Sequence, residues 1–117
     1  MHDAIEHLVA EYEAGAELHG RGTHEGDHKL ANAGYEKLAS AYRQLRERGL
    51  EAQMALLPLL SHADPAVRAW VAAHALEFAP TRGEAVLQQI MSGPPSPERL
   101  SAQMTLREWK KGTLQFP

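Results

Sequence analysis

Residues 56–78 read LLPLLSHADPAVRAWVAAHALEF, and this stretch gives the strongest indication of the fold class. Asp64 is an N-cap acid, and Pro65 occupies the first helical position, where the amide that proline lacks would have no partner in any case. After these two residues, nearly every side of the expected helix is apolar. A helix of that kind is buried on several faces instead of along one stripe. The sequence therefore predicts a central helix over residues 65–79, stopped by Pro80.

Helical periodicity continues on both sides of this central helix, whereas no stretch alternates apolar and polar residues as a strand does. Residues 20–26 contain three glycines, so we expect a mobile connector there. Pro58 lies inside a leucine-rich helix and should kink it. Thr81 and Glu84 have the spacing of a capping box. The predicted helices are residues 3–19, 27–48, 51–60, 65–79, 81–91 and 96–112, and the apolar tail 114–117 is expected to pack down as an extended strap.

The composition is that of one soluble globular domain. A chain of 117 residues has room for a single hydrophobic core. The absence of cysteine excludes disulfide scaffolds, thiolate metal sites and cysteine nucleophiles. A net charge of −3 disfavours nucleic acid as a partner, and no apolar run approaches the length that spans a membrane. The polar start of the chain has no targeting signal, so we expect a cytoplasmic protein.

Residues 56–78 resemble one HEAT-type repeat. Such a repeat pairs a leucine-rich first helix, here LLPLL at 56–60, with a second helix that begins Asp-Pro-x-Val-Arg, here DPAVR at 64–68, and continues with alanines. This motif covers about a quarter of the chain. The resemblance implies an all-α fold in which five or six antiparallel helices stack in a HEAT-like manner within one domain.

The wider layout is similar to a small bacterial family of HEAT-like proteins known only as a domain of unknown function. The residues that carry this likeness are FAP at 78–80, MTL at 104–106, Gly112 and the final Phe116-Pro117. The likeness spans nearly the whole chain. It implies a right-handed superhelical stack and no established activity.

The acidic residues are concentrated near the start of the chain. Residues 1–27 carry seven acidic side chains and one basic side chain, a net charge of −6, whereas the rest of the chain is net positive. The spacing of four of these acids puts them on one stripe of the first helix, beside its apolar face. The stripe is either a solvated face or a docking surface for a basic partner. The candidate partner-binding residues are Asp3, Glu6, Glu13 and Glu17.

Four histidines are candidates for chemistry. His24 and His28 have the four-residue spacing that places two imidazoles on one helical face for a metal, and His19 is close to them. The sequence supplies no defined third ligand, so solvated loop histidines explain the cluster better than a metal site. His74 lies in the apolar stripe of the central helix, where a hydrogen-bonded core histidine is a better explanation than a general base.

Two classes of function remain after these considerations. The first is a non-catalytic protein-binding module, because helical-repeat proteins present extended surfaces to partners, and one version is an inhibitor or immunity-type protein for a basic target. The second is a metal-binding or small-molecule-binding protein that uses the histidine-rich connector or a pocket near His74. We expect no enzyme activity and no cofactor, since one histidine without a placed nucleophile does not make an active site.

Overall fold

The central helix of the fold is α4 (Pro65–Phe78). The computed structural model describes the backbone of residues 2–117 and the side chains of residues 4–117. Asp64 caps α4 by accepting a hydrogen bond from the amide of Ala66 at 2.9 Å, as the Asp-Pro pair predicts. Val67, Val71 and Ala72 are fully buried. The expected burial of this helix on several sides is confirmed, because α4 contacts helices both before and after it in the chain.

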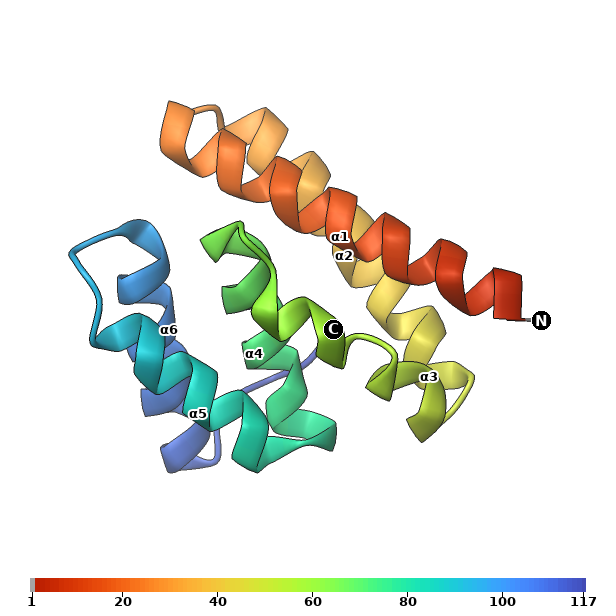
Figure 1. Ribbon diagram of the computed structural model, residues 1–117. Coiled ribbons are helices and arrows are strands. Elements are labelled where there is room, and N and C mark those ends of the chain that lie inside the picture. Colours follow the sequence, from red (N-terminus) through yellow and green to blue (C-terminus); the bar gives the residue numbers. More distant parts are fainter. Residues whose placement is uncertain (1) are drawn as a thin grey trace.

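Two long helices, α1 (His2–Glu25) and α2 (His28–Glu47), pack side by side over one flank of the molecule (Figure 1). The expected mobile connector at 20–26 is wrong, because α1 continues through it to Glu25. A Cβ on Gly20 would lie 2.4 Å from the Cβ of Ala66, so this glycine allows α1 to approach α4 closely. The turn itself needs only Gly26, whose φ is +71°, and Asp27, which caps α2.

The leucine-rich segment forms two short helices instead of one kinked helix. These are α3 (Leu50–Met54) and the 3₁₀ helix η1 (Leu57–Ser61). A proline ring clashes with the carbonyl four residues earlier and cannot donate a hydrogen bond to it. For Pro58 that carbonyl belongs to Met54, where α3 ends. The predicted helix over 51–60 is therefore broken where a kink was expected, while Leu56, Leu57 and Leu60 still pack into the core.

Helices α5 (Pro80–Met91) and α6 (Pro97–Lys111) cover the other flank of α4 (Figure 1). Helix α6 begins as expected, because Ser96 accepts from the amide of Arg99 at 3.0 Å. Thr81 does not cap α5, which begins one residue earlier at Pro80 without a side-chain cap. The tail has no regular secondary structure, and Leu114 and Phe116 pack against the core. This agrees with the prediction that residues 114–117 pack down on the protein as an extended strap.

The described part of the chain is therefore all-α, with six α-helices, one 3₁₀ helix and no strand between residues 2 and 117. The helices share one hydrophobic core, so the prediction of a single all-α domain is confirmed. Its Cα radius of gyration is 13.3 Å, close to the value of about 13 Å expected for a compact domain of about 100 residues. None of the described helices combines the length and the apolar character needed to cross a membrane.

The contact between α1 and α2 depends on Gly34. A Cβ at this position would lie 2.4 Å from the backbone nitrogen of His19, and backbone atoms within a helix cannot move aside. We expect Gly34→Ala to lower the free energy of unfolding by about 1–3 kcal/mol, the usual cost of overpacking. This loss should outweigh the preference of about 1 kcal/mol that alanine has over glycine in a helix.

Urea denaturation measures this effect, and Gly93→Ala is the matched control. A Cβ on Gly93 would meet only the carbonyl oxygen of Ile90 at 3.4 Å, which is an ordinary contact. The control should change stability by no more than about 0.5 kcal/mol. A Gly34→Ala protein as stable as the wild type would show that the two helices are not packed this closely.

Candidate functional site

The predicted acidic stripe is divided in the structure. Glu6 and Glu17 are exposed on α1, as the docking hypothesis requires. Glu13 is half-buried, because it accepts a hydrogen bond from Nε2 of His62, 2.8 Å from its Oε2. The side chain of Asp3 lies outside the described residues. Of the predicted stripe, the structure therefore describes two exposed carboxylates, Glu6 and Glu17, and one that is bonded to His62, Glu13.

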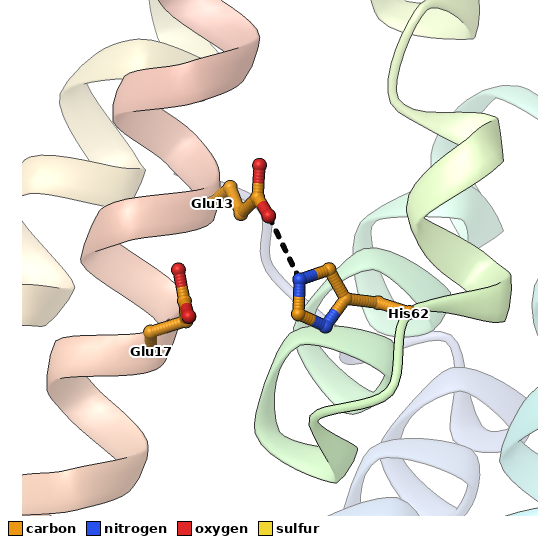
Figure 2. Close-up of side chains that lie close together, drawn as sticks. All are labelled: Glu13, Glu17 and His62. Atoms are coloured by element: carbon orange, nitrogen blue, oxygen red, sulfur yellow. Dashed lines mark hydrogen bonds and ion pairs between the residues drawn. The ribbon is translucent and has the colours of Figure 1, made fainter.

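Glu13, Glu17 and His62 lie together between α1 and the loop that precedes α4 (Figure 2). One ligand-type atom from each residue lies within 4.8 Å of the others, so the group resembles a set of metal ligands. No other group of this kind occurs among the described residues. The spacing of four residues between the two glutamates follows from the helix, whereas His62 comes from 49 residues further along the chain.

The hydrogen bonds of His62 argue against a metal at this group. Its Nδ1 accepts from the backbone amide of Asp64 at 2.9 Å, so the imidazole proton is on Nε2 and is donated to Glu13. A histidine that binds a metal through one ring nitrogen almost always donates a hydrogen bond from the other nitrogen. Here Nδ1 accepts one instead. The group is therefore best described as a hydrogen bond that ties α1 to the start of α4.

The three histidines of the expected connector do not come together. Nδ1 of His19 accepts from the indole N–H of Trp70 at 3.2 Å. His24 pairs with Glu98 in α6, 3.0 Å from its Oε2, and His28 is exposed in α2. The cause is the continuation of α1 through His24, since His28 belongs to the next helix after a reversal of the chain. A metal site that uses these histidines has no geometric support.

His74 is a buried core histidine, as its place in the apolar stripe predicts. It is 3% exposed, and its Nδ1 lies 2.6 Å from the hydroxyl of Tyr12. The ring of Tyr42 stacks on its other side, with the two centroids 4.3 Å apart. Burial lowers the pKa of His74 to about 3, and the charge of Arg46 contributes to the same shift. A group with that pKa is a poor general base near neutral pH, where catalytic bases work best with a pKa close to the operating pH.

Further polar groups connect His74 to the surface. The hydroxyl of Tyr42 donates to Glu77 at 2.5 Å and accepts from the side-chain amide of Gln53 at 3.1 Å. Arg46 pairs with the same oxygen of Glu77 at 3.0 Å. Burial raises the pKa of Tyr42, and the hydrogen bond to Glu77 acts in the same direction. The network joins α1, α2, α3 and α4, so we assign it a structural role.

Two neighbouring cavities open beside α4, and the smaller one reaches this network at His74. One, of about 230 Å³, lies between the last turns of α1, the first half of α4 and the first half of α6. The other, of about 190 Å³, lies between α4, Tyr35 of α2 and the tail, and His74 lines it. Trp70, Ala73 and Thr105 line both cavities. The pocket near His74 that the sequence suggested is therefore present.

The larger cavity was not predicted from the sequence, although a signal for it exists. Ala66, Ala69 and Ala73 recur on one side of α4 and all line this cavity. Small residues at helical spacing also indicate close packing between helices, so the pattern alone does not distinguish a cavity from a contact. Trp70 belongs to α4 as well, whereas Glu98 comes from α6, which only the fold brings to this side of α4.

Comparison with known proteins assigns the chain to a family without assigning an activity. The model of a family described as Domain of unknown function (DUF2019) matches residues 8–110, which is most of the chain. No curated protein and no solved structure matches.

Proposed function

The chain belongs to the DUF2019 family, whose description names no activity, and from the geometry of the chain we propose a non-catalytic protein-binding module that docks onto a basic protein through α1. The observation that carries the proposal is the exposure of Glu6 and Glu17, neither of which forms an ion pair with a described side chain. By contrast, Glu11 on the same helix is paired with Lys37 and with His7.

The spacing of the two free carboxylates defines what a partner must contact. They are eleven residues apart, close to three helical turns, so they share one face of α1 and lie about 16 Å apart along its axis. Complementary charge on a partner would steer its approach and fix its orientation. An inhibitor or immunity-type protein that covers a basic cleft would use such a surface.

We also propose that the helices stack in a HEAT-like manner. In support, the leucine-rich η1 packs on α4, the helix that begins with the Asp-Pro-x-Val-Arg motif, and α4 packs in turn on α5. Proteins built from such repeats work by offering extended surfaces to partners. The step from this stacking to protein binding is an analogy between folds.

Reversing the two exposed charges tests the docking surface. We expect the double variant Glu6→Lys with Glu17→Lys to lose capture of its partner from a lysate, because two attractive charges become repulsive. Capture by the wild type should weaken as salt rises, since the screening length falls from about 10 Å at 0.1 M to about 3 Å at 1 M. Glu13 is left unchanged in this variant, because its bond to His62 holds the fold.

The matched control is the double variant Glu36→Lys with Glu47→Lys, which changes the net charge equally on α2. Both residues are exposed, and neither forms an ion pair with a described side chain. The control should keep the partner, and each of the four exposed substitutions should alter stability by no more than about 0.5 kcal/mol. If both double variants retain the partner equally, or if capture is independent of salt, then α1 is not the docking surface.

A further inference from the structure

The larger cavity between α1, α4 and α6 has the walls of a small-molecule site. Its lining is mostly apolar and includes the alanines of α4 together with Leu87 and Ala102. A few polar side chains lie among these groups, including Thr23 and Ser101. Ligand sites in proteins combine mostly apolar walls with a small number of polar groups in this way. The volume, about 230 Å³, is below the usual range of about 300–1,000 Å³, so a ligand would be small.

The cavity carries one negative charge and no fixed positive charge. Glu98 lines it with a side chain that is only 11% exposed, and no lysine or arginine does so. The one other ionisable side chain in the lining is His19, and burial lowers the pKa of that imidazole although the charge of Glu98 acts in the opposite direction. The only ion pair of Glu98 among the described residues is with His24, which lies 53% exposed at the surface. Apolar walls weaken the screening of a carboxylate, so the cavity favours a cation.

Trp70 supplies the second element of the site. Its indole N–H is already donated to His19, and the two rings meet edge to face with centroids 5.0 Å apart. Because its only polar group is engaged, Trp70 lines the cavity as an apolar ring, with Tyr35 and His74 packed nearby at centroid distances of 5.6 and 5.7 Å. Aromatic rings pack against one another in offset-stacked or edge-to-face pairs, which adds to the gain from burying their area. A carboxylate and an indole in one small cavity are complementary to an ammonium group attached to an apolar body.

We propose that this cavity binds a small organic cation, an amine with a single apolar or aromatic ring, with its ammonium group at Glu98 and its ring against Trp70. The proposal rests on the lining of the cavity and is independent of the docking surface on α1. The hydroxyls of Thr23 and Ser101 are available as further acceptors for the ammonium protons.

Binding of three probes that share a phenyl ring tests the charge preference. These are 2-phenylethylamine, the neutral 2-phenylethanol and the anionic 3-phenylpropionate, added at pH 8 to full-length protein that carries Trp109→Phe. Because the chain has two tryptophans, fluorescence of this variant reports Trp70 alone. We expect a saturable change with the amine and about tenfold weaker binding, or none, with the other two probes.

Substitution at Glu98 tests the assigned contact. We expect Glu98→Gln to weaken amine binding about tenfold or more, because the variant keeps the shape of the side chain and an acceptor for His24 but removes the charge. Glu84→Gln, a carboxylate in α5 that does not line the cavity, is the matched control and should bind the amine like the wild type. Thermal unfolding in the absence of probe shows whether each variant is folded.

A second variant keeps the test decisive if Glu98→Gln is unstable. Ala69→Leu places a larger apolar side chain in the cavity and should abolish amine binding while far-ultraviolet circular dichroism remains helical. The proposal is overturned if the anionic or neutral probe binds as tightly as the amine. It also fails if Glu98→Gln or Ala69→Leu binds the amine like the wild type, or if the amine shows no saturable binding at millimolar concentration.

Discussion

Val71→Asp is expected to unfold the protein. Val71 is 0% exposed in the middle of α4, the helix that the other elements surround. An unpaired carboxylate in such a site costs several kcal/mol, against a total stability of roughly 5–15 kcal/mol for a domain of this kind. Far-ultraviolet circular dichroism should show a large loss of helix at 25 °C, or a urea midpoint shifted far below that of the wild type.

A substitution to aspartate at an exposed helical position is the control for this effect. Ala85 lies exposed in α5, and Ala85→Asp should change the free energy of unfolding by no more than about 0.5 kcal/mol. A Val71→Asp protein with the midpoint of the wild type would mean that this side of α4 faces solvent.

Local signals explain why α4 could be predicted from sequence. The Asp-Pro pair caps the helix through atoms only two residues apart, and a helix that is apolar on nearly every side is buried on several faces. The glycines of residues 20–26 show the limit of such reasoning. Gly20 and Gly26 are the same residue type within one short segment, yet Gly20 serves close packing on Ala66 while Gly26 makes a turn. The difference depends on what lies opposite each of them, which spacing along the chain does not reveal.

Pairing between distant residues accounts for what the sequence did not predict about the candidate sites. Glu13 belongs to the acidic stripe by its spacing, but its bond to His62, 49 residues away, leaves its side chain half-buried. By its spacing His24 belongs to a candidate metal cluster, whereas the fold pairs it with Glu98, 74 residues away. The burial of His74 was predictable because periodicity reports the face of a helix. Its partner Tyr12, on another helix, was not.

The stability of the protein should fall as the pH is lowered, with His74 as a major cause. The folded state holds the pKa of His74 at about 3, below the value of about 6.5 for an unfolded histidine. Between these two values the unfolded state binds a proton that the folded state does not, so acid favours unfolding. The contribution of His74 to the free energy of unfolding is fully present above about pH 6.5. As the pH falls from there toward 3, this contribution decreases by about 1.4 kcal/mol for each pH unit.

The groups around His74 explain why it stays neutral. Tyr12 of α1 donates its hydroxyl hydrogen to Nδ1 of His74. Because Tyr12 is fully buried and the described residues offer its hydroxyl no other partner, this direction of the hydrogen bond is the one that satisfies the hydroxyl. Burial raises the pKa of Tyr12, so the hydroxyl keeps that hydrogen. Arg46 of α2 adds a positive charge nearby, and Glu77, the nearest carboxylate of the network, bonds to Tyr42 and Arg46. A proton on Nδ1 would reverse this bond, so that the hydroxyl oxygen of Tyr12 accepts and its own hydrogen is left without an acceptor among the described residues.

Comparison of unfolding curves isolates this effect from the other titrating groups. At pH 7 we expect His74→Gln to be less stable than the wild type, because the variant lacks the packed imidazole ring. Between pH 6.5 and pH 4 its free energy of unfolding should decrease less than that of the wild type. The difference between the two urea-denaturation curves should therefore narrow as the pH falls. His28→Gln, at an exposed histidine of α2, is the control, and its free energy of unfolding should change with pH in the same way as that of the wild type. Parallel curves for His74→Gln, or an NMR titration of His74 near pH 6.5, would place its imidazole in water and contradict the buried hydrogen bond to Tyr12.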